Sequence, residues 1–117
     1  MARVLVMDDD RSSRFAIAAT LRQAGYDMVE AANGLEALQL LIDDPNFAAI
    51  LSDVQVAPLD GLRLLNEVHR HYPTIPVIIA SGRAEQAVQA QQQRAAGCLT
   101  KPFSRQQLVK SVTTATG

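Results

Sequence analysis

The fold is decided by a short apolar run that ends in an acid, Ala48-Ala49-Ile50-Leu51-Ser52-Asp53. Three other apolar runs also end in residues that carry chemistry: Arg3–Met7 runs into Asp8-Asp9-Asp10, Pro76–Ala80 into Ser81-Gly82, and Cys98–Thr100 into Lys101-Pro102. In an open parallel α/β sheet the carboxyl ends of the strands lie along one edge. We therefore expect these side chains, which are far apart in the sequence, to meet in one crevice.

The order of the elements favours a parallel sheet covered by helices. Five short apolar runs alternate with amphipathic segments, which is typical of βαβ units. The predicted strands are Arg3–Met7, Asp27–Ala31, Phe47–Ser52, Pro76–Ala80 and Cys98–Thr100. The predicted helices are Ser12–Ala24, a segment after Asn33-Gly34, a segment through Leu62 and Val68 that ends before Tyr72-Pro73, Ala84–Ala95, and a last helix opened by the capping box of Ser104 and Gln107.

Apolar spacing assigns a core face to the helices. The first helix carries Phe15, Ala18, Ala19 and Leu21 and is predicted to stop at Gly25, and the second carries Leu35, Leu38, Leu41 and Ile42. The predicted face of the fourth helix is poor in large apolar side chains: Ala84, Ala87, Val88, Gln91 and Ala95. Because marginal packing makes an element easy to shift, we expect the fourth helix to be the segment that responds to a signal.

Length and composition describe one ordinary domain, which we assign to residues 1–117. The 11 basic and 12 acidic residues are scattered, so the chain lacks the basic stripe of a protein that binds nucleic acid directly. The single cysteine, Cys98, excludes an intramolecular disulfide. No signal peptide is recognisable, and no apolar stretch reaches the roughly 20 residues that span a bilayer. The simplest expectation is a cytoplasmic protein without membrane contact.

The residues at the strand ends predict a metal-dependent phosphoryl site. Carboxylates of Asp8, Asp9 and Asp53 that converge within about 4 Å repel by roughly 4 kcal/mol per pair at an effective dielectric of 20, so they need a cation. Oxygen ligands of this kind suit Mg²⁺. A carboxylate beside the metal can attack a phosphoryl group, while Lys101 and the hydroxyl of Ser81 hold its oxygens. Asp10, by contrast, is expected to form a turn or cap a helix.

In these motifs and their order the whole chain resembles the receiver domain of two-component response regulators. The matching residues are the acidic pair after the first strand, the aspartate after the third with Asp60-Gly61 beyond it, the serine after the fourth and Lys-Pro after the fifth. The resemblance implies a flavodoxin-like (βα)5 fold, a three-layer sandwich around a parallel five-stranded sheet of order 2-1-3-4-5. It also implies a signalling domain rather than an enzyme. Such a domain catalyses only its own phosphorylation and dephosphorylation.

The resemblance also assigns a role to each residue of the site. Asp53 would accept a phosphoryl group from a histidine kinase or a histidine phosphotransfer domain. Asp9 and Asp53 would bind Mg²⁺ directly, Asp8 through a water, and the main-chain carbonyl of Gln55 would complete the protein's share. Lys101 would pair with the phosphoryl group, Ser81 would move to bond it, and Lys101-Pro102 would be a cis peptide. Output to a further domain or a downstream protein would use the fourth helix, fifth strand and fifth helix, and a dimer that forms on phosphorylation is compatible with this.

Four positions depart from the family pattern. The usual proline four residues after the phosphorylated aspartate is Ala57, with Pro58 one place later. Cys98 stands where an aromatic residue is common, so we expect switching without the movement of a ring. Arg94 replaces a common glycine, and Ser81 replaces the commoner threonine.

Two alternative functions use the same residues. A haloacid-dehalogenase-like phosphohydrolase would use Asp8 as its nucleophile within Asp8-x-Asp10-x-Ser12, but residues 102–117 hold no acidic residue for that family's later motif, and Asp53 would have no role. An interaction module that is never phosphorylated would not need the intact acidic pair, Asp53 and Lys101. A nucleotide-binding P-loop is excluded because its glycine-lysine motif is missing.

Overall fold

The computed structural model describes residues 2–54 and 61–117, and within these ranges the chain alternates strands and helices. The strands are β1 (Arg3–Met7), β2 (Asp27–Ala31), β3 (Ala49–Asp53), β4 (Val77–Ser81) and β5 (Gly97–Thr100). The helices are α1 (Arg11–Gln23), α2 (Gly34–Asp43), α3 (Gly61–His71), α4 (Ala84–Gln92) and α5 (Arg105–Thr116). All strand pairs are parallel, in the order β2-β1-β3-β4-β5, which confirms the predicted topology.

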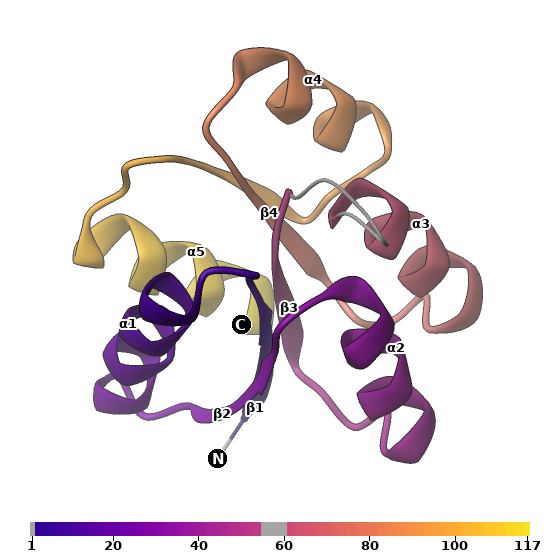
Figure 1. Cartoon of the computed structure of the whole chain (residues 1–117), viewed down its shortest axis with the longest axis horizontal. Coiled ribbons are helices and arrows are strands. Elements are labelled where there is room, and N and C mark those ends of the chain that lie inside the picture. Colours follow the sequence, from indigo (N-terminus) through magenta and orange to yellow (C-terminus); the bar gives the residue numbers. More distant parts are fainter. Residues whose placement is uncertain (1, 55–60) are drawn as a thin grey trace.

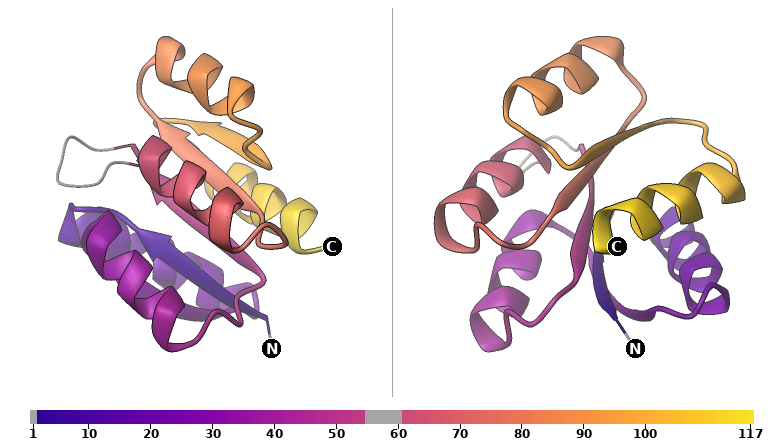
Figure 2. Two further views of the ribbon diagram at one scale, coloured as in Figure 1. Left: turned by 90° about the vertical axis from the view of Figure 1, so that its right-hand side faces the viewer. Right: turned by 180° about the vertical axis from the view of Figure 1, so that it is seen from behind.

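The sheet is the middle of three layers. Helices α1 and α5 cover one face, and α2, α3 and α4 cover the other (Figures 1 and 2). Each face holds its own apolar cluster, because alternate residues of a strand point to opposite faces. Leu5 and Met7 of β1 pack with α2 and α3, whereas Val4 and Val6 pack with α1 and α5. The three central strands are buried on both faces, which explains why they read as continuous apolar runs.

Two strands end one residue later than predicted. Strand β3 covers Ala49–Asp53 rather than Phe47–Ser52, and β4 covers Val77–Ser81 rather than Pro76–Ala80. The ladder continues because Asp53 pairs with Ala80 and Ser81 pairs with Thr100. Phe47 lies outside β3, and its N–H donates to the carbonyl of Pro45 instead of to a neighbouring strand. Asp53 and Ser81 therefore stand on the rigid sheet, not in the loops that follow it.

Helix α4 ends earlier than predicted, at Gln92 rather than Ala95. Arg94 has a φ of 65°, the left-handed conformation that favours glycine. The N–H of Arg94 donates to the carbonyl of Gln91, and the N–H of Ala95 donates to that of Ala90. These two bonds form a Schellman motif, so Arg94 occupies the position where a glycine is ordinarily found. Helix α1 ends in the same way with Gly25 at a φ of 101°, as predicted.

The predicted core faces of three helices are wrong in part. Phe15 of α1 is 64% exposed, Leu35 and Ile42 of α2 are exposed, and Val88 of α4 is 51% exposed. Ala18 of α1 is fully buried, as predicted, whereas the fully buried Ala37 and Ala90 were not among the residues predicted to face the core. The predicted end of α3 before Tyr72 and the capping box of Ser104 and Gln107 are confirmed. Within the described ranges, no helix is both long enough and apolar enough to cross a membrane.

Candidate functional site

Asp53 and Lys101 come from strands that are not neighbours, since β4 lies between β3 and β5. The Lys101 N–H donates to the carbonyl of Ser81 at 2.8 Å, so the chain after β5 passes over the end of β4. From there the Lys101 side chain reaches Asp53, with Nζ 2.6 Å from Oδ1. The Asp53 side chain is 5% exposed and that of Lys101 is 34% exposed, so a partly hydrated ammonium group covers a buried carboxylate.

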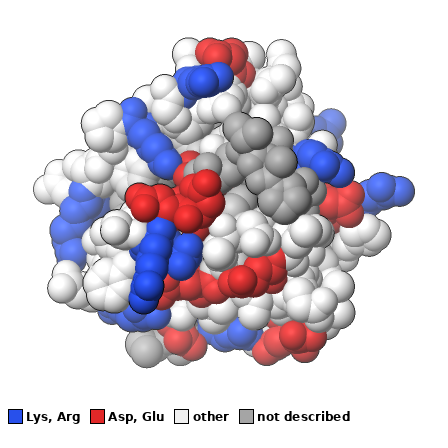
Figure 3. All heavy atoms as spheres, viewed as in Figure 1, with Lys and Arg blue, Asp and Glu red and all other residues white. Residues whose placement is uncertain are grey.

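The three carboxylates predicted to converge do so. One oxygen each of Asp8, Asp9 and Asp53 lies within 4.8 Å of the others, with Asp8 and Asp53 buried and Asp9 exposed. Acidic side chains gather on the face shown in Figure 3, with lysine or arginine side chains next to them. Asp8 Oδ1 accepts a hydrogen bond from the N–H of Asp10 at 2.9 Å. Asp8 Oδ2 is buried and has no hydrogen-bond partner among the residues that the structure describes.

This donor set fits a hard divalent cation. A buried carboxylate oxygen without a donor is costly, and a cation among the three carboxylates, or a water bound to that cation, would satisfy it. Mg²⁺ suits the cluster because it accepts a few carboxylate oxygens and keeps several waters. The predicted fourth contribution, the main-chain carbonyl of Gln55, lies outside the described residues, as do Ala57, Pro58 and Asp60.

The surroundings of Asp53 raise its pKa from 3.8 to about 6. Burial is the largest cause, and the negative charge of Asp8 acts in the same direction, whereas the hydrogen bond and charge of Lys101 oppose them. The carboxylate of Asp53 is thus held in a site that disfavours its charge. For the same reason, binding of a cation that neutralises the negative charge of Asp53 is favoured.

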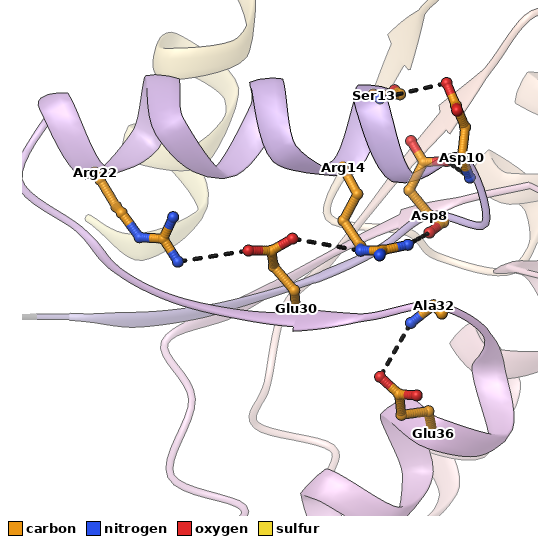
Figure 4. Close-up of polar contacts among 8 residues, drawn as sticks. All are labelled: Asp8, Asp10, Ser13, Arg14, Arg22, Glu30, Ala32 and Glu36. Carbon is orange, nitrogen blue, oxygen red and sulfur yellow. Dashed lines mark hydrogen bonds and ion pairs between the residues drawn. The ribbon is translucent and has the colours of Figure 1, made fainter.

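Arg14 of α1 contacts the loop that carries the acidic pair (Figure 4). Its Nη1 donates to the carbonyl of Asp8 at 2.8 Å, and its Nε lies 3.4 Å from Oε1 of Glu30 on β2. The other oxygen of Glu30, Oε2, lies 3.5 Å from Nη2 of Arg22, which is further along α1. The side chain of Arg14 is only 16% exposed, and it links the loop after β1 to β2 and α1.

Asp10 and Gly61 have structural roles at the edges of the site. Asp10 is the N-cap of α1, where its carboxylate accepts from the N–H of Ser13, as predicted. A Cβ at Gly61 would lie 2.7 Å from the carbonyl oxygen of Asp53 and 2.8 Å from Oγ of Ser52. Only glycine lets the start of α3 approach the end of β3 this closely. The Lys101-Pro102 peptide is cis, as expected.

Ser81 and Cys98 both face helix α4. The hydroxyl of Ser81 is 2.7 Å from Oε1 of Gln86 in the first turn of that helix. Cys98, half-buried on β5, points its Sγ at the carbonyl of Ala87, 3.9 Å away. Burial raises the pKa of the Cys98 thiol. Neither Gln86 nor Arg14 was predicted from the sequence, because nothing in its neighbours marks a glutamine or an arginine of an amphipathic helix as a partner of the site.

Comparison with known proteins identifies one family. The family model described as "Response regulator receiver domain" matches residues 4–113. A putative NtrX-like response regulator of Rickettsia conorii is 39% identical over 115 residues, which are 96% of this chain and 24% of that protein. The chain thus spans about a quarter of the length of the curated relatives it matches.

Two solved structures extend the likeness to the fold. A receiver domain protein of Clostridium thermocellum has a TM-score of 0.93 at 25% identity and covers 99% of this chain and 94% of its own. The chemotaxis protein CheY4 of Vibrio cholerae has a TM-score of 0.89 at 31% identity and covers 98% of both chains.

Proposed function

Because this chain belongs to the family of response regulator receiver domains of two-component signalling, we propose that Asp53 is the residue that accepts the phosphoryl group. The observation that carries this assignment is the contact of 2.6 Å between Lys101 Nζ and Asp53 Oδ1, beside the carboxylates of Asp8 and Asp9. Among the aspartates of the cluster, Asp53 combines burial, a cationic partner and a position at the end of the central strand β3.

Mg²⁺ would be held directly by Asp9 and Asp53, through a water by Asp8, and by the main-chain carbonyl of Gln55. When bound, the ion would supply positive charge to the carboxylates and to the oxygens of the incoming phosphoryl group. Asp8 supports this role because its buried Oδ2 has no hydrogen-bond partner among the described residues. Arg14 fixes the backbone of Asp8 and thereby the direction in which the acidic pair points.

The donor would be a phosphohistidine of a histidine kinase or of a histidine phosphotransfer domain. An oxygen of the Asp53 carboxylate attacks phosphorus, an O–P bond forms, and the N–P bond breaks with its electron pair left on the imidazole nitrogen. The Lys101 ammonium group, already beside Asp53, would pair with the phosphoryl oxygens, and the Ser81 hydroxyl would donate to one of them. Water attack on the same phosphorus would return the free carboxylate, so the domain catalyses only its own phosphorylation and dephosphorylation.

Output would pass through the surface of α4, β5 and α5, to a further domain of the same protein, to a downstream protein, or to a second copy in a dimer that forms on phosphorylation. The half-buried Cys98 and the weakly packed α4 lie on this surface. We place the protein in the cytoplasm, where response regulators typically act, and expect no direct contact of this domain with nucleic acid.

The test is phosphoryl uptake from acetyl phosphate, followed by mass spectrometry of the intact protein. We expect the mass of one phosphoryl group on the parent only with Mg²⁺, and none on Asp53→Asn. Asp10→Asn is the matched control, since that residue caps α1, and it should be phosphorylated like the parent. Uptake that persists in Asp53→Asn would move the nucleophile to Asp8, as in the phosphohydrolase alternative. No uptake by the parent would favour an interaction module.

A further inference from the structure

The hydroxyl of Ser81 is already engaged on the side of α4. Its oxygen lies 2.7 Å from Oε1 of Gln86 and 3.0 Å from the carbonyl oxygen of Arg83, and it accepts a hydrogen bond from the Arg83 N–H at 3.0 Å. A serine hydroxyl has a single hydrogen to donate. The contact with Gln86 is the shorter one and has the usual length of an O–H···O bond. The single hydrogen of Ser81 is therefore donated to Gln86 and is not available to a group on Asp53.

Helix α4 has few other attachments at this end. Ala90 is its one fully buried residue in the part of the chain that the structure describes, and Val88 is 51% exposed. The N-cap residue Arg83 makes no side-chain capping bond. Gln86 itself is half-buried in the first turn. The bond from Ser81 to Gln86 is thus a polar link between the end of β4 and a helix that apolar packing holds weakly.

We propose that Gln86 is a positioning residue that competes with the phosphoryl group for the hydroxyl of Ser81. This inference rests on the proposed function, in which Ser81 donates to a phosphoryl group on Asp53. One hydrogen cannot serve both acceptors, so occupation of Asp53 releases Gln86 and with it the first turn of α4. Gln86 therefore lowers the affinity of the site for a phosphoryl group and transmits occupation to α4. Because Cys98 carries no ring, this link provides a route from Ser81 to α4 that needs no aromatic side chain.

A double-mutant cycle tests the competition, with beryllofluoride and Mg²⁺ as the probe and ¹⁹F NMR of the bound complex as the readout. Gln86→Ala should bind beryllofluoride about 2- to 10-fold more tightly than the parent, the range that corresponds to the net contribution of one hydrogen bond. Gln89→Ala is the matched control, an exposed glutamine of the same helix, and should leave the affinity unchanged. In a Ser81→Ala background, Gln86→Ala should have no effect, because the shared hydroxyl is gone.

Hydrogen exchange gives a second readout. The amides that donate to the carbonyls of the first turn of α4 should exchange faster in free Gln86→Ala than in the free parent, and beryllofluoride should change their exchange less in the variant than in the parent. Gln86→Met, which keeps the length of the side chain without an acceptor oxygen, replaces Gln86→Ala if that variant does not fold.

The outcomes separate this inference from the function on which it rests. A parent that does not bind beryllofluoride in the presence of Mg²⁺ overturns the proposed function and the competition together. A parent that binds, with Gln86→Ala equal to Gln89→Ala, overturns the competition alone. Tighter binding by Gln86→Ala that persists in the Ser81→Ala background also overturns it, since the gain would then come from general loosening of α4.

Discussion

Replacing Asp53 by asparagine should make the metal-free protein more stable at pH 8. Burial, with the charge of Asp8, raises the pKa of Asp53 to about 6, against 3.8 for the ordinary carboxyl. The folded state therefore binds the proton of Asp53 more tightly than the unfolded state does. The free energy of unfolding falls as the pH rises from about 4 through about 6, and it stays lower above that range.

The size of the effect follows from the same two pKa values. The difference between them corresponds to about 3 kcal/mol, which is lost from the stability of the parent when Asp53 is fully ionised. Asparagine resembles the protonated carboxyl, so Asp53→Asn should be about 1 to 3 kcal/mol more stable than the parent at pH 8 and nearly equal to it at pH 4. Mg²⁺, which we propose binds at the acidic cluster of the folded parent, should narrow the gap at pH 8.

Urea unfolding with a chelator at pH 4, 6 and 8, and again at pH 8 with Mg²⁺, measures these free energies. Asp27→Asn is the control, an exposed aspartate at the start of β2, and should stay within about 0.5 kcal/mol of the parent throughout. An Asp53→Asn protein that is no more stable than the parent at pH 8 would refute the reasoning. So would a gain that is the same at pH 4 and pH 8, since it could not come from ionisation.

Two further substitutions test other parts of the structure. Arg94→Gly should raise the free energy of unfolding by roughly 1 kcal/mol, because glycine adopts the φ of 65° without strain. Gln93→Gly, at a φ of −89°, should lower the free energy of unfolding. Urea unfolding compares the two variants, and equal effects would contradict the account of the helix end. Arg14→Lys should weaken Mg²⁺ binding by about 10-fold, because lysine cannot contact the Asp8 carbonyl and Glu30 together. Arg22 contacts Glu30 but not Asp8, so Arg22→Lys should bind Mg²⁺ as tightly as the parent does. Calorimetric titration with Mg²⁺ distinguishes the two variants.

The strands and the site residues at their ends could be predicted from the sequence. Continuous apolar runs mark strands buried on both faces, and parallel strands bring their carboxyl ends together whatever lies between them in the chain. Asp8, Asp9, Asp53 and Lys101 were predicted on this basis, and the structure brings them together. The strand ends were misplaced by one residue at Asp53 and Ser81, since a polar residue looks like the start of a loop even when its backbone still pairs.

The faces of the helices could be predicted only in part. Apolar periodicity gives most weight to large side chains, but α2 and α4 place Ala37 and Ala90 against the sheet, and Phe15, Ile42 and Val88 are exposed. The contacts of Arg14 and Gln86 depend on which turn of a helix lies over which strand end. That placement is a property of the packed molecule and leaves no mark in the local sequence.

The most direct test of the central claim is to locate the phosphoryl group on the chain. An aspartyl phosphate is an acyl phosphate, and borohydride reduces it to homoserine, a stable product that peptide mass spectrometry can assign to one position. After treatment with acetyl phosphate and Mg²⁺, we predict conversion at position 53 and at no other aspartate. Conversion at Asp8, or no conversion in a folded protein that binds Mg²⁺, would contradict the assignment of Asp53 as the phosphoacceptor.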